Sequence, residues 1–408
     1  MTRVALSIPM ESWDYIFQFH EFVHKDHANG VEGLAAVRFL RGVFEPSWKG
    51  EGSRRHPMFQ RVAQASEDSY RSLIEHARKI RAVQAIPGFS TLLARLGNPD
   101  EYAAASAEME VALMLRFGGF DVAFVETGLG PSPDLMVSGE GKTFAVEVGS
   151  LNPPEEDARL NDVAGRVIFA GLRRAATGGV ISRPPSNGES KAIDIEVSAA
   201  VQRAIEGHRV ERVNFPGLAT IYVAPRDLAG QMPEDMRDQF CTVPLYRGPP
   251  EEKIARAVRG KLRQLGAGVV PSVLFLFDRS LGAETLSKLF DDPADDVSVV
   301  LSSVPVLMGL AVIAPIHSLL DPKRASRKSR GRKTLLRIQT GVREWTDVLL
   351  WENQHSDEKL PAAVLGSLEE YNSNLSHLPD FRLQESAGSK PASGPPSGET
   401  DGESDVAK

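Results

Sequence analysis

The spacing of apolar residues divides the chain into a helical first part and a mixed second part. Apolar residues recur at helical intervals over Trp13–Ala28, Val31–Val43 and Met58–Val83. A loop containing Pro and Gly at residues 44–50 separates the second of these stretches from the third. The pattern predicts a helical N-terminal region over residues 1–98.

From Pro99 onwards, helical spacing alternates with short β-branched or alternating runs. The expected helices are Pro99–Phe117, Pro154–Ala176, Ser198–Gly207 and Pro250–Leu265. The expected strands are Phe120–Val125, Leu135–Val137, Thr143–Val148, Ala192–Val197, Leu218–Val223, Val273–Phe277, Val297–Leu301 and Val306–Ile313. Strands that alternate with helices indicate an α/β fold, so residues 99–320 are predicted to form one α/β core.

The last part of the chain changes in composition twice. Residues 321–333 are rich in Lys and Arg without an apolar anchor, and they predict a flexible basic segment. Residues 334–383 are expected to form a strand and helix region, with an edge strand at Leu335–Ile338 and a helix that contains Trp345 and Trp351. Residues 384–408 are Ser, Gly, Pro and acidic residues, which predicts a disordered tail because few apolar groups offset the ordering entropy.

Composition narrows the classes of protein that remain. A chain of 408 residues is long enough for two or three folded units. Its formal net charge of −7 means that no global positive field attracts nucleic acid, so any such binding depends on a local patch. The single cysteine, Cys241, excludes an internal disulfide framework and a cysteine zinc site.

No secretory or membrane segment is expected. The N-terminus lacks a charged region followed by a continuous apolar run. The most apolar stretch, Val304–Ile316, is too short to span a bilayer and is interrupted by proline and glycine, so it is expected to be a buried strand. These features predict a cytoplasmic protein.

Three acidic residues on consecutive elements are the strongest candidates for chemistry. Glu108 lies on the helix that begins near Pro99, Asp134 follows Pro133 at the start of a strand, and Glu147 lies on the next strand. Mg²⁺ prefers carboxylate oxygens, and a metal beside a phosphate can position and activate water. The order of these elements predicts a divalent-metal site for phosphodiester cleavage.

This arrangement over residues 104–150 resembles the PD-(D/E)XK nuclease superfamily, which has the restriction-endonuclease-like fold. The resemblance implies a mixed sheet flanked by helices, cleavage of DNA with RNA as the alternative substrate, and Mg²⁺ or Mn²⁺ as cofactor. It also implies that Asp134 and Glu147 bind the metal and that Glu108 supports it through water.

The chain departs from the family pattern at Gly149, where the motif has a lysine that orients water and stabilises charge at phosphorus. In this superfamily the lysine can move to another core element. Lys261 is the favoured replacement, since with Gln264 it lies on the helix before strand Val273–Phe277. Lys142 is less suitable, because it lies five residues before Glu147 on a strand that rises about 3.3 Å per residue.

Two further patterns suggest other chemistry. His20-Glu21-Phe22-Val23-His24 matches the HExxH pattern of zinc metalloproteases, although short matches of this kind occur by chance and no third-ligand pattern follows. In the basic segment, Arg327, Lys328, Arg330, Arg332 and Lys333 are candidates for contacts with nucleic-acid phosphates; a solvated loop is the alternative.

The sequence therefore predicts an α/β, restriction-endonuclease-like core with a helical N-terminal extension and a disordered C-terminal tail. The favoured function is a Mg²⁺-dependent nuclease in which Glu108, Asp134, Glu147 and Lys261 carry the reaction. The alternative is a member of the same fold that has lost catalysis and binds nucleic acid or a partner protein. A zinc metalloprotease is the third hypothesis.

Overall fold

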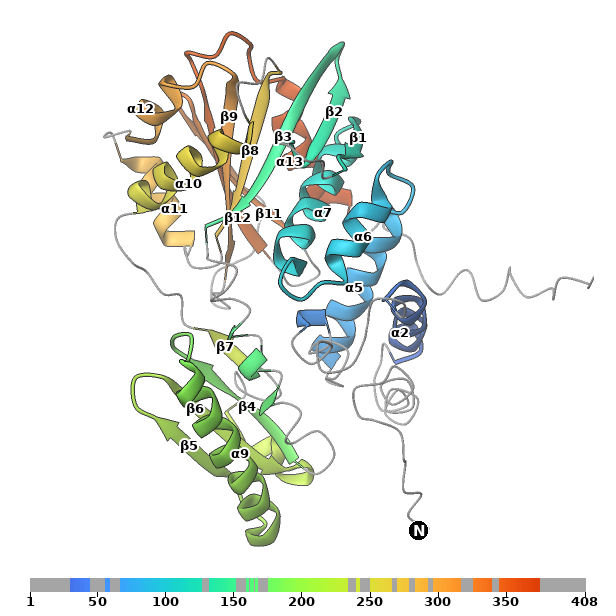
Figure 1. The fold of residues 1–408 in the computed structure, drawn as a ribbon, viewed down its shortest axis with the longest axis vertical. Helices are drawn as coiled ribbons and strands as arrows, with labels where there is room; N and C mark the ends of the chain where they lie inside the picture. Colours follow the sequence, from blue (N-terminus) through green and yellow to red (C-terminus); the bar gives the residue numbers. More distant parts are fainter. Residues whose placement is uncertain are drawn as a thin grey trace, which may run out of the picture.

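The architecture is an α/β sandwich with a second, smaller α/β unit (Figure 1). The computed structural model describes residues 30–44, 56–58, 67–126, 132–151, 159–160, 162–164, 166–167, 175–233, 240–242, 250–265, 270–278, 283–292, 296–316, 326–339 and 345–374.

Among the described residues, a run of helices comes first, and groups of strands separated by helices follow. The helices are α2 (Gly30–Phe44), α5 (Glu67–Val83), α6 (Phe89–Leu96), α7 (Tyr102–Phe117), α9 (Asn187–Gly207), α10 (Pro250–Leu265), α11 (Ala283–Asp291), α12 (Asp296–Ser302) and α13 (Ala362–Asn374), with a 3-10 helix η2 (Arg226–Gln231). The strands are β1 (Asp121–Phe124), β2 (Leu135–Gly139), β3 (Lys142–Ser150), β4 (Ala175–Ile181), β5 (Glu211–Phe215), β6 (Ala219–Pro225), β7 (Phe240–Thr242), β8 (Ser272–Phe277), β9 (Leu307–Ile316), β10 (Ser326–Arg330), β11 (Lys333–Gln339) and β12 (Trp345–Glu352).

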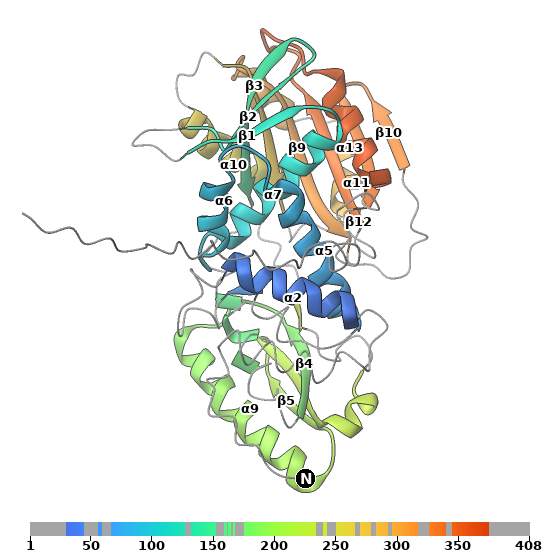
Figure 2. The ribbon, with the colours of Figure 1, turned by 90° about the vertical axis from the view of Figure 1, so that its right-hand side faces the viewer.

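Eight strands form the main sheet in the order β1-β2-β3-β8-β9-β12-β11-β10. β3, β8 and β9 are parallel, and the neighbours on either side of this group are antiparallel, so the sheet is mixed. β1 and β10 form the two edges, and Figure 2 shows them on opposite sides of the sheet. The predicted α/β sandwich with a mixed, helix-flanked sheet is confirmed at this level.

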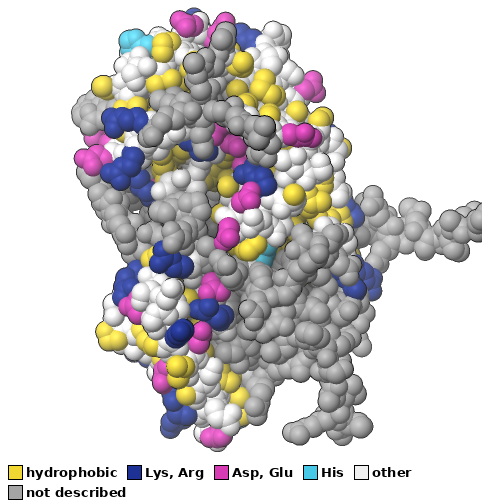
Figure 3. Space-filling view, in the orientation of Figure 1, with side chains coloured by type: hydrophobic (Ala, Val, Ile, Leu, Met, Phe, Trp, Pro, Cys, Tyr) yellow, Lys and Arg dark blue, Asp and Glu magenta, His cyan; other side chains and the backbone are white. Residues whose placement is uncertain are grey.

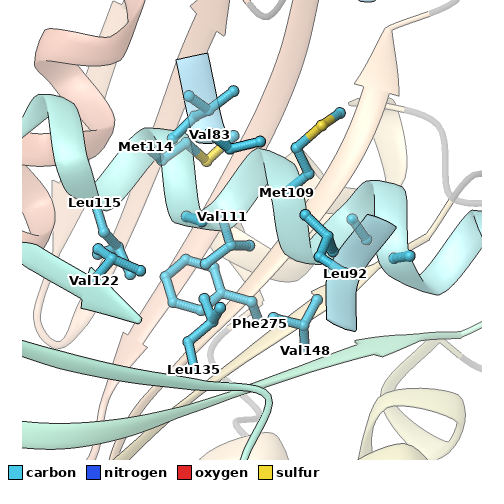
Figure 4. Packing of buried hydrophobic residues seen from close by; sticks show 14 of the residues in the cluster. Val83, Leu92, Met109, Val111, Met114, Leu115, Val122, Leu135, Val148 and Phe275 are labelled. Atoms are coloured by element: carbon cyan, nitrogen blue, oxygen red, sulfur yellow. The ribbon is translucent and has the colours of Figure 1, made fainter. Parts of the chain in front are cut away.

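Helices cover both faces of the main sheet. Side chains that alternate along each central strand enter two separate cores, as the two-residue period of a strand requires. Val148 and Phe275 pack with α7 and α13 on one face, whereas Leu274 and Leu276 pack with α10, α11 and α12 on the other. Figure 4 shows part of the first core, in which Val111 and other side chains of α7 are directed at the strands.

A second sheet of four strands, in the order β5-β6-β4-β7, lies between β3 and α10 in the sequence. α9 packs on this sheet through Ile193, Val197 and Ala200. Figure 1 shows this unit apart from the main sheet. The prediction of one α/β core over residues 99–320 is therefore too simple, because this range contributes strands to two sheets.

Three predicted elements are wrong. In each of them, a short apolar run fits the period of a helix as well as the period of a strand. Ala192–Val197 belongs to α9, which starts at a capping box between Ser186 and Glu189. Val297–Leu301 lies in α12, with the side chains of Val297 and Leu301 buried one helical turn apart. Trp345 and Trp351 lie on β12, where residues 346–351 are all buried because helices cover both sheet faces.

The N-terminal region is helical wherever it is described at length. α2 and α5 pack against each other, and their apolar side chains join the core on the α7 face of the sheet. The predicted helix Trp13–Ala28 and the predicted tail at residues 384–408 lie outside the described residues. None of the described helices has the length and apolar character needed to cross a membrane.

Candidate active site

Asp134 and Glu147 meet where β2 and β3 begin to pair. Leu135 is the register partner of Val146, so continuing the antiparallel register places Asp134 opposite Glu147. The backbone N–H of Asp134 donates to the carbonyl of Val146 (3.1 Å), and Asp134 Oδ2 accepts from the backbone N–H of Val148 (2.8 Å). Residues directly opposite one another share a sheet face, so the two carboxyl groups lie at one end of one face.

Glu147 points away from α7 and toward α10. Its neighbours Val146 and Val148 pack into the core beneath α7, so the alternation of the strand directs Glu147 to the opposite face. The side chain is only 2% exposed, and its Oε1 accepts a hydrogen bond from Lys261 Nζ at 2.6 Å. Its other oxygen, Oε2, is buried without a hydrogen-bond partner among the described residues.

Lys261 occupies the space beside Gly149. A Cβ atom built on Gly149 would lie 3.1 Å from Lys261 Cε and 2.9 Å from Leu276 Cδ2. The stem of Lys261 therefore runs where a side chain at position 149 would begin, and its ammonium group reaches Glu147. Lys261 comes from α10, whose Ile254 and Val258 anchor the helix in the core on this face.

Glu108 is held by an arginine that the sequence did not single out. Arg95 Nη1 and Nη2 donate to the two carboxylate oxygens of Glu108 at 2.6 Å and 2.7 Å. Glu108 is 3% exposed and Arg95 is 21% exposed. Arg95 Nε also pairs with the more exposed Glu101 at 3.1 Å.

The start of α6 fixes the place of Arg95. Gly88 precedes this helix with φ of +79°, and an added Cβ would lie 2.1 Å from the backbone oxygen of Phe124. This close approach holds α6 against β1, while Leu92 and Leu96 bury its other side. No short motif marks Arg95, so the one available sequence signal is an arginine on the helix preceding the acidic helix.

The electrostatics connect these five side chains into one site. Burial and the charge of Asp134 raise the pKa of Glu147 to about 7, while Lys261 acts in the opposite direction. Burial and Asp134 likewise raise the pKa of Glu108 to about 8, against the effect of Arg95 and, more weakly, Lys261. Asp134 thus lies close enough to influence both glutamates, which approach it from the two sides of the sheet.

The donor set suits a hard divalent cation, but two of its three carboxylates are already engaged by protein cations. Within the described part of the chain, no three His, Cys, Asp or Glu side chains are grouped as a metal cluster. Arg95 holds both oxygens of Glu108, and Lys261 holds one oxygen of Glu147. The buried, unpartnered Oε2 of Glu147 beside Asp134 is the feature that fits Mg²⁺ or Mn²⁺.

The basic segment is not a flexible arm where the structure describes it. Ser326–Arg330 forms the edge strand β10, paired through a turn at Gly331 with β11. Leu335–Ile338 is accordingly an internal strand rather than the predicted edge strand. We call residues 326–339 the basic hairpin. Five strand spacings separate β3 from β10, which is about 24 Å.

The cations of the basic hairpin bind groups of their own chain. Lys333 is buried, and its Nζ donates to the carbonyls of Leu289 (3.1 Å) and Asp292 (3.0 Å). Arg330 donates to the carbonyl of Asp291 at 2.8 Å. Two further pairs are exposed: Arg327 with Glu369 at 2.9 Å and Arg332 with Glu352 at 3.7 Å. Lys328 is exposed and has no hydrogen-bond or ion-pair partner within the part of the chain that the structure describes.

The face of the molecule in Figure 3 carries basic and acidic side chains intermixed. The contact of the cations of the basic hairpin with nucleic acid stays a prediction, and the hairpin lies far from the candidate site in the sheet.

The remaining predicted residues do not join the site. Lys142 pairs with Glu358 at 2.7 Å, with both side chains about half exposed. The side chain of Gln264 and the whole HExxH stretch, His20 to His24, lie outside the described residues.

Comparison with known proteins identifies no relative. A scan of protein-family models, a search of curated proteins and a search of solved structures each found no match. The functional argument therefore depends on the geometry of this site.

Proposed function

We propose that this protein is a metal-dependent nuclease that hydrolyses phosphodiester bonds, with DNA as the expected substrate and RNA as the alternative. The observation that supports this most strongly is the position of Lys261. Its stem fills the space at Gly149 and its Nζ lies 2.6 Å from Glu147, so a cation is available where the nuclease pattern has its lysine.

Asp134 and Glu147 would hold Mg²⁺ or Mn²⁺, with Glu108 as a supporting partner through water. The ion would polarise the phosphate and help to activate the attacking water. Lys261 would stabilise negative charge on the phosphoryl oxygens and orient the water. As the water oxygen bonds to phosphorus it would release a proton to solvent, the bond from phosphorus to the leaving sugar oxygen would break, and that oxygen would take up a proton from solvent.

The second candidate is a binding protein that has this fold and has lost catalysis. Gly149 favours this alternative, because the motif position itself carries no lysine. The pairing of Arg95 with Glu108 also fits it, since buried ion pairs can be purely structural. The zinc metalloprotease stays a third hypothesis, because its motif lies outside the described residues.

The test is cleavage of supercoiled plasmid DNA and of labelled RNA by the purified full chain with Mg²⁺ or Mn²⁺. We expect the wild-type protein to cut and a chelator to stop it. Asp134→Asn should reduce cleavage to the level of the chelated sample, because the amide cannot supply the anionic ligand. Asp121→Asn on the exposed start of β1 is the matched control and should cut normally.

Absence of cleavage by wild type with either ion would favour the binding protein. Cleavage that survives Asp134→Asn would place the activity elsewhere in the chain or in a contaminant.

A further inference from the structure

Arg95 determines what Glu108 can still do in the candidate site. Both carboxylate oxygens of Glu108 accept hydrogen bonds from the guanidinium group, at 2.6 Å and 2.7 Å. This fork geometry is the strong form of an arginine–carboxylate pair. A metal ion that took Glu108 as a direct ligand would have to displace a partly buried partner that makes two hydrogen bonds to it.

The other two carboxylates are less occupied. Asp134 uses Oδ2 to accept from the backbone N–H of Val148, which leaves Oδ1 outside that bond. Glu147 uses Oε1 for Lys261, and its Oε2 is buried without a partner among the described residues. A nearly fully buried oxygen in this state calls for a cation or a proton.

The formal charges of the five side chains favour one bound divalent ion over two. With all groups ionised, Glu108, Asp134 and Glu147 together with Arg95 and Lys261 carry a net charge of −1. One divalent ion would make the site +1, which a phosphodiester group of charge −1 balances. Two divalent ions would leave a large positive excess beside Glu108 and Glu147, which are almost entirely buried, and burying uncompensated charge is costly.

Resting on the nuclease function proposed above, we infer that Arg95 is a positioning residue that keeps Glu108 out of direct metal coordination. The site accordingly binds one divalent ion, at Asp134 and Glu147, rather than two. The guanidinium group of Arg95 thus binds the Glu108 carboxylate that a second metal ion would otherwise bind.

The experiment measures Mn²⁺ binding to the full-length protein by calorimetry and by electron paramagnetic resonance, without substrate. We expect one ion per chain in the wild-type protein. Glu108→Gln should keep that stoichiometry and weaken binding by about 10-fold, as loss of an outer partner does. Asp134→Asn should abolish measurable binding. Arg95→Gln should free Glu108 and add a second, weaker ion, whereas the control Glu101→Gln should change neither number.

Two ions per chain in the wild-type protein would overturn the inference, and so would loss of all binding in Glu108→Gln. A wild-type protein that binds no Mn²⁺ would also overturn it. If Arg95→Gln does not fold, the wild-type stoichiometry and the Glu108→Gln result still decide. One bound ion without any cleavage would uphold this inference and refute the nuclease function. Cleavage with two bound ions would support the nuclease function and refute this inference.

Discussion

The two groups of cations in this protein, in the basic hairpin and in the candidate site, differ in what they bind. In the hairpin, Lys333 and Arg330 donate to backbone carbonyls near the end of α11, and Arg327 pairs with an exposed glutamate. In the site, Lys261 and Arg95 each bind a glutamate that is 3% exposed or less. The hairpin has the higher density of charge in the sequence, yet the site has the cations placed beside buried acids.

The comparison teaches that a run of charge in a sequence does not identify a functional surface. Backbone carbonyls at a helix end attract cations, and such contacts stabilise the fold. Lys and Arg on an edge strand such as β10 also discourage pairing with other chains. Isolated cations far apart in the sequence, such as Arg95 and Lys261, become informative only when the fold brings them to the same carboxylates.

The largest effect is expected from Lys261→Met, which removes the ammonium group and keeps much of the stem. Single-turnover cleavage of DNA should fall by about 10²- to 10⁴-fold, the usual contribution of a group that transfers protons or stabilises charge in the transition state. Binding of DNA should change far less than cleavage. A variant that cleaves at the wild-type rate would show that Lys261 only neutralises Glu147.

Lys333→Met is the matched change in the basic hairpin. In contrast to Lys261→Met, it should lower stability and leave cleavage unchanged. The carbonyls of Leu289 and Asp292 would lose their buried donor, so we expect a loss of about 1–3 kcal/mol in unfolding free energy. Denaturant unfolding measures this quantity. Cleavage by the folded variant should match wild type, and a selective loss of cleavage would contradict the separation of the two regions.

The stability of the metal-free protein should depend on pH through Glu147. Burial raises the pKa of Glu147 in the folded state from 4.5 to about 7, so between these values the folded state holds a proton that the unfolded state has released. Stability from this group is present at low pH and is lost as pH rises toward 7.

Glu147→Gln imitates the protonated form and should therefore gain thermal stability relative to wild type between about pH 5 and about pH 8. Thermal melts of both proteins in the presence of chelator measure this difference. A difference that is constant across this range would contradict the raised pKa of Glu147.

The smallest effect is expected from Arg327→Ser combined with Lys328→Ser on the exposed strand β10. If these cations contact phosphates, the log–log dependence of DNA affinity on salt should flatten by about 1.8, and thermal stability should stay nearly constant. Filter binding over a range of salt concentrations measures the slope. An unchanged slope would mean that these cations do not contact phosphates and only discourage the pairing of β10 with other chains.

Local patterns predicted the elements around the site better than they predicted how the sheets are assembled. The helix with Glu108, the strand that follows Asp134 and the strand with Glu147 have clear periods and glycine stops, and the structure has α7, β2 and β3 there. The division into two sheets has no local signal, because β3 pairs with β8 across the inserted four-stranded unit. Short apolar runs in α9 and α12 fit the period of a helix and that of a strand, so tertiary packing determines which of the two forms.

Within the candidate site, the acids and Lys261 were identified from the sequence, whereas Arg95 was not. The acids follow one another on consecutive elements, and Lys261 was suggested by the resemblance to the nuclease pattern. Arg95 lies 13 residues before Glu108 on a separate helix, and its orientation depends on Gly88 packing against Phe124. Pairing of this kind depends on tertiary structure and leaves no spacing to find.

The most direct test of the account moves the lysine back to the motif position. Lys261→Ala removes the two Lys261 atoms that lie nearest to a Cβ at Gly149, so that Gly149→Lys then requires a shift of Leu276 Cδ2, which would lie 2.9 Å from that Cβ. We predict that Lys261→Ala alone loses single-turnover cleavage of DNA in Mg²⁺ and that adding Gly149→Lys restores a substantial part of it. Equal, inactive rates for the folded single and double variants, beside an active wild type, would contradict the claim that Lys261 replaces the missing lysine.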